Sequence, residues 1–117
     1  MIRQNTEHGT ITVESNVYRN IAGMAASNCF GVKGMAARSR KDGLIYLLRK
    51  ESANKGVSIT FNEDDTISID LHIMVEHGVN IPVISSSIIS EVAYNVEKST
   101  GTTVKHINVH VDSITLD

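Results

Sequence analysis

Residues 66–76 read Thr-Ile-Ser-Ile-Asp-Leu-His-Ile-Met-Val-Glu, and the order of side chains in this stretch decides the fold. Every second residue from 67 to 75 is aliphatic, and the residues between them are polar except Met74. Successive side chains of a β-strand point to opposite faces, so this alternation predicts a strand with one buried and one polar face. The buried face has to be covered by a second layer of the protein.

Shorter segments with the same alternation lie on both sides of this strand. Residues 9–13, 57–61 and 103–112 each place apolar side chains at every second position, and each is predicted to form a strand. Residues 1–8 are polar and are predicted to be flexible.

Two segments carry apolar residues at helical spacing and are predicted to be α-helices, over residues 15–28 and 82–99. Gly101 follows the second helix as its expected stop. A third, shorter helix is predicted over residues 43–51. The side of the first helix predicted to be buried consists of Val17, Ile21, Met24, Ala25 and Asn28.

The predicted order of elements is β-α-(α)-β-β-α-β, which is typical of an α+β protein. Right-handed connections would place both long helices on one face of a mixed sheet, giving a two-layer sandwich. A split βαβ arrangement of the ferredoxin-like kind is one topology that fits this order. With 117 residues, we expect a single domain covering residues 1–117.

Composition indicates a protein of the cytoplasm. Cys29 is the single cysteine and has no partner for an internal disulfide, which suits a reducing compartment. The sequence contains no run of about 18 apolar residues, so we expect no membrane span. Residues 1–9 lack the apolar stretch of a signal peptide.

Charge is unevenly distributed along the chain. Residues 33–55 contain seven Lys or Arg and two acidic residues, 7 − 2 = +5, whereas the remainder carries 4 − 11 = −7. The net charge of −2 argues against strong non-specific binding of nucleic acid. The basic segment is consistent with a solvated surface, with docking on an acidic protein, or with contact to anionic lipid or nucleic acid. The candidate partner-binding residues are Arg38, Arg40, Lys41, Arg49 and Lys50.

Three histidines are predicted to lie on the polar face of the sheet, and they form the one candidate metal site. His106 and His110 share a strand but are about 13 Å apart, because a strand rises about 3.3 Å per residue. A zinc ion would therefore need His72 on the neighbouring strand, opposite one of them, and a carboxylate. A solvated or oligomer-facing surface explains the same residues without a metal.

No catalytic or cofactor-binding motif is recognisable. Cys29 follows an apolar segment with no histidine beside it in sequence, which is typical of a small buried side chain. Residues 31–34 match neither the phosphate-binding loop nor the dinucleotide fingerprint, and residues 85–87 lack the context of a serine nucleophile. The sequence therefore predicts a non-enzymatic binding or scaffold protein without a cofactor.

Several strings resemble a known family when they are taken in order. Residues 10–34 read Thr-Ile-Thr-Val-Glu-Ser-Asn-Val-Tyr-Arg-Asn-Ile-Ala-Gly-Met-Ala-Ala-Ser-Asn-Cys-Phe-Gly-Val-Lys-Gly and resemble the opening of the alkaline shock protein family. Strings at 41–44, 47–51, 55–57, 69–73, 76–78 and 104–111 continue the likeness. The family is also called the envelope stress response family of Gram-positive bacteria, and the chain is most similar to its YloU-like subgroup over residues 9–112.

The resemblance departs from the family pattern at two places. His77 stands where the family often has tyrosine, and residues 82–87 replace the usual Glu-Val-Ala-x-Asn-Val start of the helix. The family's partner-binding faces are therefore not carried over to this chain.

The resemblance implies a cytoplasmic, non-enzymatic protein of cell-envelope homeostasis, which reaches the membrane only through a partner. It also implies a dihydroxyacetone-kinase-like protein partner. Separately from the resemblance, the uneven charge and the lack of a catalytic set lead us to expect a homo-oligomer. It transfers no catalytic residues, because none are known for the family.

Overall fold

The computed structural model describes residues 1–39 and 41–116, and it has the predicted α+β architecture. The two α-helices are α1 (Ser15–Ser27) and α2 (Ile81–Thr100), and η1 (Lys50–Gly56) is a 3₁₀ helix. The strands are β1 (Ile2–Thr6), β2 (Gly9–Val13), β3 (Val32–Arg38), β4 (Ile45–Leu47), β5 (Val57–Phe61), β6 (Ile67–Val75) and β7 (Val104–Ile114).

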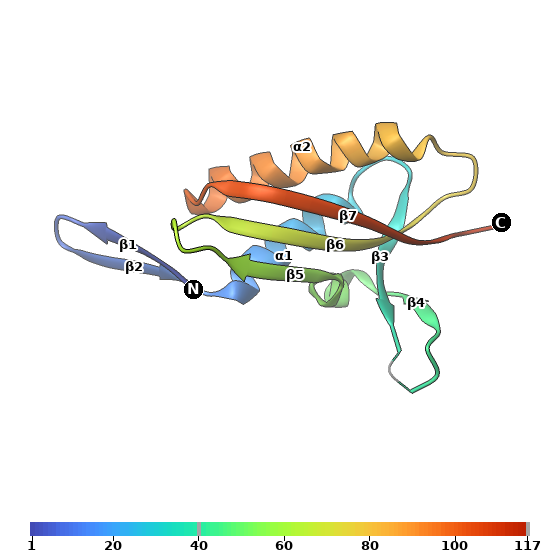
Figure 1. The fold of residues 1–117 in the computed structure, drawn as a ribbon, viewed down its shortest axis with the longest axis horizontal. Coiled ribbons are helices and arrows are strands. Elements are labelled where there is room, and N and C mark those ends of the chain that lie inside the picture. The colour runs from blue at the N-terminus through green and yellow to red at the C-terminus, as the bar shows by residue number, and fades with distance from the viewer. Residues whose placement is uncertain (40, 117) are drawn as a thin grey trace.

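Strand β6 is the centre of a mixed sheet (Figure 1). Along one side it pairs in parallel with β7 over its whole length. Along the other side it pairs antiparallel first with β5, over residues 67–71, and then with β3, over residues 73–75. Strand β4 extends this sheet beyond β3. The strand predicted from the alternating stretch is thus the one around which the rest of the sheet is arranged.

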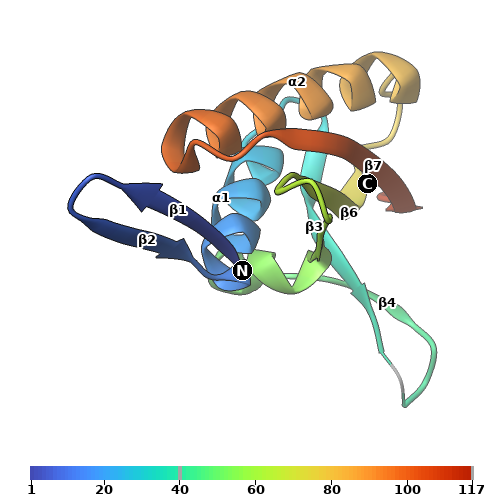
Figure 2. The ribbon, with the colours of Figure 1, turned by 60° about the vertical axis from the view of Figure 1, so that its left-hand side comes forward.

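Both α-helices cover one face of this sheet, as the alternation predicts (Figures 1 and 2). The five alternating aliphatic side chains of β6 are fully buried, and its polar side chains are only half-buried on the opposite face. Helix α2 contributes a buried stripe at helical spacing, and Gly101 ends this helix with a φ of 74°. The members of the stripe are Ile84, Ile88, Val92 and Val96.

The ferredoxin-like topology does not occur. Strands β6 and β7 are direct neighbours, so no strand lies between the two halves of the βαβ unit. Strand β2 is not in the main sheet, because it pairs with β1 in a separate two-stranded sheet. The predicted ferredoxin-like connectivity is therefore wrong, although the two long helices and the strands at 9–13, 57–61, 66–76 and 103–112 are present.

The predicted helix over residues 43–51 is wrong, because this segment completes a β-hairpin. Strand β4 pairs with β3, which the sequence analysis missed, and the register places Ala36 opposite Leu47. At the turn, the Asp42 carboxylate accepts hydrogen bonds from the Leu44 amide (3.0 Å) and the Tyr46 hydroxyl (2.8 Å). Pairing with β3 satisfies the backbone of β4, so strand partnership overrides the local helical pattern.

The predicted buried side of α1 is also wrong, because the buried stripe lies about one residue further along the helix than predicted. The buried residues are Tyr18, Ala22, Gly23 and Ala26, while Val17 and Met24 are exposed. Small side chains allow a close approach here, since a Cβ on Gly23 would lie 3.1 Å from the backbone carbonyl of Ala53 in η1. The larger apolar side chains of α1 are consequently left near the surface.

Residues 2–6 form β1 rather than the flexible segment that the sequence predicts. The hairpin of β1 and β2 extends from one end of the molecule (Figures 1 and 2). Two contacts hold its base: Ile2 is buried in the core, and the Gln4 amide donates a 2.6 Å hydrogen bond to the Thr100 carbonyl.

Helix α1 is linked to the end of α2 by one buried polar contact. The Tyr18 hydroxyl and the Thr102 hydroxyl lie 2.6 Å apart, and both residues are buried. The Tyr18 ring also contacts Phe61 edge-on, with ring centroids 5.9 Å apart. A buried hydroxyl that loses its partner costs about 1–3 kcal/mol.

We therefore expect Tyr18→Phe to lower the free energy of unfolding by about 1–3 kcal/mol, because it leaves the Thr102 hydroxyl without this partner. Urea denaturation measures the effect. Tyr94→Phe is the matched control, since Tyr94 is exposed on α2 and its removal should cost less than about 0.5 kcal/mol. Equal losses in the two variants would contradict a structural role for the Tyr18–Thr102 contact.

Candidate functional site

The polar face of the sheet brings together side chains from β6 and β7. The parallel register places Asp70 beside Asn108 and His72 beside His110. The register then shifts between Ile73 and Met74. Strand β7 consequently carries one extra residue at this position, Asp112, which reaches His72.

Two histidines, two aspartates and one asparagine form a compact group here, which we call the His–Asp cluster (Asp70, His72, Asn108, His110, Asp112). The imidazole rings of His72 and His110 stack with centroids 4.6 Å apart and an interplanar angle of 12°. His72 Nδ1 lies 3.0 Å from Asp112 Oδ2, and His110 Nε2 lies 3.1 Å from Asp70 Oδ1. Each ring is therefore oriented by a carboxylate on the neighbouring strand.

The cluster stabilises the ionised form of Asp70. The hydrogen bond from His110 is the largest cause that lowers the pKa of this carboxyl group, and burial opposes it. The hydrogen bond from Asn108 and the electrostatic effect of His110 and His72 lower the pKa further. The carboxyl group is partly exposed to solvent, so water screens much of this interaction.

His106, the third predicted candidate, lies apart from the stacked pair. It is exposed opposite Ser68, four residues before His110 on the same strand. Among residues 1–39 and 41–116 there is no group of three or more His, Cys, Asp or Glu side chains placed to hold a metal ion. The structure thus joins His72 and His110, and leaves His106 outside the cluster.

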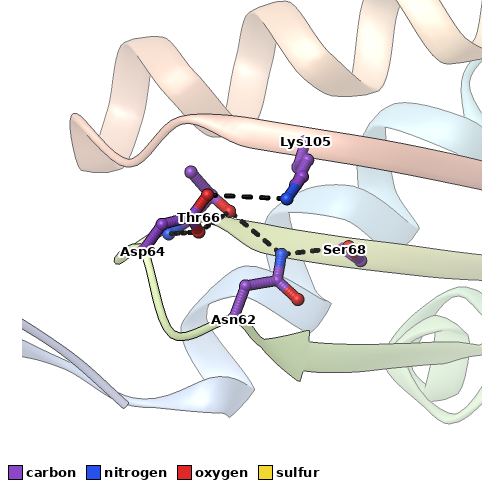
Figure 3. A network of polar contacts seen from close by, with 5 residues as sticks. All are labelled: Asn62, Asp64, Thr66, Ser68 and Lys105. Atoms are coloured by element: carbon purple, nitrogen blue, oxygen red, sulfur yellow. Dashed lines mark hydrogen bonds and ion pairs between the residues drawn. The ribbon is translucent and has the colours of Figure 1, made fainter.

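A second network holds the turn between β5 and β6 beside this face (Figure 3). The Asn62 amide donates hydrogen bonds to the hydroxyls of Thr66 (3.0 Å) and Ser68 (3.1 Å). Lys105 Nζ on β7 lies 3.6 Å from the Asp64 carboxylate. These contacts fix the turn, and they engage side chains that could otherwise bind a ligand.

The helical layer contains a groove of about 770 Å³ between α1 and α2. Cys29 lines it, and its thiol donates a weak hydrogen bond to the Ala25 carbonyl at 3.3 Å. Burial, with a smaller effect of the Glu91 charge, raises the pKa of this thiol, which favours the less reactive protonated form. Phe30 at the groove is 86% exposed, a feature that the sequence analysis missed.

The basic segment forms a projecting hairpin, which we call the basic arm (residues 32–39 and 41–50; Figure 2). Its cations Lys33, Arg38, Lys41, Arg49 and Lys50 are all exposed, and Asp42 is the only acidic residue in these two ranges, so they carry 5 − 1 = +4. Four of the five predicted partner-binding residues therefore face solvent. The fifth, Arg40, lies outside the described residues.

Comparison with known proteins identifies the family. The sequence pattern of the alkaline shock protein 23 family, which has a cell envelope-related function, matches residues 3–116. The chain belongs to this family. The match confirms the resemblance seen in the sequence, and it links the protein to cell-envelope and stress-related biology.

Similar members of the alkaline shock protein family occur in Gram-positive bacteria. The chain is 34% identical to the uncharacterized protein YloU of Bacillus subtilis, covering 97% of this chain and 94% of that one. It is 37% identical to the uncharacterized protein Spy1614 of Streptococcus pyogenes, over 97% and 93% of the two chains. A stress response regulator gls24 homolog of Streptococcus pyogenes is 31% identical over 91% of this chain and 59% of its own.

No solved structure matches this alkaline shock family chain. In the described part of the sequence, neither α-helix combines the length and the apolar character that crossing a bilayer requires.

The His–Asp cluster makes a prediction about acid stability. The pKa of Asp70 is lower in the folded state than in the unfolded state, where it is about 3.9. Asp70 therefore stabilises the fold at pH values above the unfolded pKa, and this stabilisation is lost as the pH falls through the folded pKa. We expect Asp70→Asn to remove this contribution, which is less than about 1 kcal/mol because water screens the interaction. Between about pH 5 and pH 3, the free energy of unfolding should therefore fall less in the variant than in the wild type.

Urea denaturation at several pH values measures this difference. Glu63→Gln is the control, since Glu63 is exposed in the turn after β5 and makes no side-chain hydrogen bond to any described residue. An Asp70→Asn curve that follows the wild-type pH dependence would contradict the role given to the cluster.

Proposed function

We propose that this protein is a non-enzymatic scaffold of the cell-envelope stress system, which self-associates along β7 and presents its basic arm to an anionic partner. Family membership supports the envelope-related setting. The free edge of the sheet supports self-association, and it is the observation on which the proposal mainly depends.

Strand β7 is eleven residues long and pairs with β6 along one side only. Within the described ranges, no strand pairs with its outer side. Such an edge presents backbone N–H and C=O groups in a row, which is a template for pairing with another strand. Strand β5 lies at another edge of the sheet but has only five residues.

A second copy of the same chain suits this edge. Two β7 strands related by a two-fold axis would pair antiparallel and join the two sheets into one. The polar faces would then be continuous, with the His–Asp clusters of both copies on the same side. The register shift near Asp112 locally disturbs the strand, so we expect pairing to be centred on residues 106–110.

The resemblance to the alkaline shock family suggests a dihydroxyacetone-kinase-like protein as a further partner of this assembly. Two alternatives have less support. A metal-binding or enzymatic role for the histidines has less support because the structure joins only two of the three, and within residues 1–39 and 41–116 no group of three or more His, Cys, Asp or Glu side chains is placed to hold a metal ion. Nucleic-acid binding by the basic arm would leave the exposed apolar side chain of Leu44 without a role, because binding to phosphates depends on the cations.

Light scattering after size exclusion tests the proposed assembly. We expect the wild-type chain of 12.8 kDa to give a larger mass at micromolar concentration, and His106→Lys/Asn108→Lys to give the monomer mass. The two added lysines place like charges along the β7 edge, which disfavours pairing.

Ser58→Lys/Thr60→Lys is the matched control, with the same two lysines added on exposed positions of β5. It should retain the wild-type mass. A wild-type chain that stays monomeric up to high concentration would contradict self-association. If only the β5 variant became monomeric, the interface would be assigned to β5 and not to β7.

A further inference from the structure

We propose that the basic arm attaches the protein to the surface of an anionic lipid bilayer, by inserting the apolar residues of its tip between lipid headgroups. This inference rests on the proposed function, in that it names the chemical class of the arm's anionic partner. It does not depend on self-association, because the hairpin that forms the arm is made by one chain.

The arm exposes apolar side chains on both faces of the hairpin. Leu47 pairs with Ala36 and lies against Gly34, on the open side of the sheet. Tyr46 pairs with Ala37 and therefore points to the opposite side. Leu47 is 43% exposed and Tyr46 is 48% exposed, so the rest of the protein covers each of them only in part.

Leu44 extends the apolar surface to the turn, where it is 57% exposed. Hydrogen bonds connect the described residues around Leu44. The Arg38 guanidinium donates to the Gly43 carbonyl at 2.7 Å, and Asp42 accepts from Leu44 and Tyr46. The acidic side chain of the arm is thereby engaged within the turn, and these contacts are present in the chain without any partner.

Cations lie at both ends of β4. Lys41 lies in the turn, and Arg49 and Lys50 follow β4 toward the body of the molecule. A surface that combines aliphatic side chains, a tyrosine and several cations is typical of proteins that lie at the headgroup level of a membrane. Each Lys or Arg near an anionic leaflet contributes about 1 kcal/mol to binding.

The two-sided apolar surface favours a bilayer over an acidic protein. A protein partner that docks on one side of a β-ribbon leaves the other side in water, and would not account for exposed Tyr46 and Leu47 on opposite faces. A bilayer surrounds an inserted tip on all sides. The body of the protein, which is acidic as a whole, would then stay outside the headgroup layer.

Co-sedimentation of the full chain with vesicles tests the proposal. We expect binding to vesicles of phosphatidylcholine with about 30% phosphatidylserine, roughly tenfold or more weaker binding to phosphatidylcholine alone, and weakening at high salt. Lys41→Glu/Arg49→Glu should reduce the affinity at least about tenfold, and Leu44→Ser about three- to tenfold.

Matched controls separate the arm from general charge and apolar content. Arg3→Glu/Lys98→Glu makes the same change of charge on β1 and α2, and Leu116→Ser removes a leucine that is 85% exposed elsewhere. Both controls should bind vesicles as the wild type does. Thermal melting confirms that each variant is folded, and light scattering shows separately whether it still self-associates.

The proposal is overturned if the wild type does not bind the phosphatidylserine vesicles at low salt, or if the controls weaken binding as much as the arm variants. Arm-dependent binding to poly-L-glutamate without binding to vesicles would also overturn it, and would assign the arm to an acidic protein. In each of these three cases the light-scattering result for the β7 edge stands independently.

Discussion

Burial of one face of β6 is the constraint on which the rest of the structure depends. Its five aliphatic side chains are fully buried, and each contributes about 1.5–3 kcal/mol relative to an exposed position. Helix α2 supplies a matching stripe, and α1 packs through small residues that let η1 approach closely. Because both helices are used to cover this face, they leave the opposite face uncovered.

The open face and the projecting hairpins follow from this one-sided arrangement. On the open face, polar side chains pair across β6 and β7, and the His–Asp cluster satisfies them without a ligand. Strand β7 is left with one side unpaired by any described strand, and the basic arm extends past the edge of the helical layer. A strand edge and a basic arm are therefore available for contact, as the proposed scaffold role requires.

Sequence reasoning succeeded where one physical signal dominated. The alternation in β6 and the helical stripe of α2 identified these elements closely, as did the glycine that ends α2. It failed where the outcome depended on a distant partner: residues 43–51 look helical in isolation, yet β4 forms because β3 pairs with it. In α1, large side chains suggested the wrong buried face, because close approach to Ala53 selected Ala22 and Gly23 instead.

The candidate site was predicted only in part, for a related reason. The polar face and its histidines could be read from the period of two, but which of them meet depends on the parallel register and the extra residue at Asp112. The cations of the basic arm were evident from composition, whereas the opposite placement of Tyr46 and Leu47 depends on a strand where the sequence predicts a helix.

Amide hydrogen exchange, measured residue by residue, tests the central position of β6 most directly. At low protein concentration we predict the slowest exchange in β6, and alternating slow and fast amides along β7. Exchange in β6 as fast as in the β1–β2 hairpin would contradict the account.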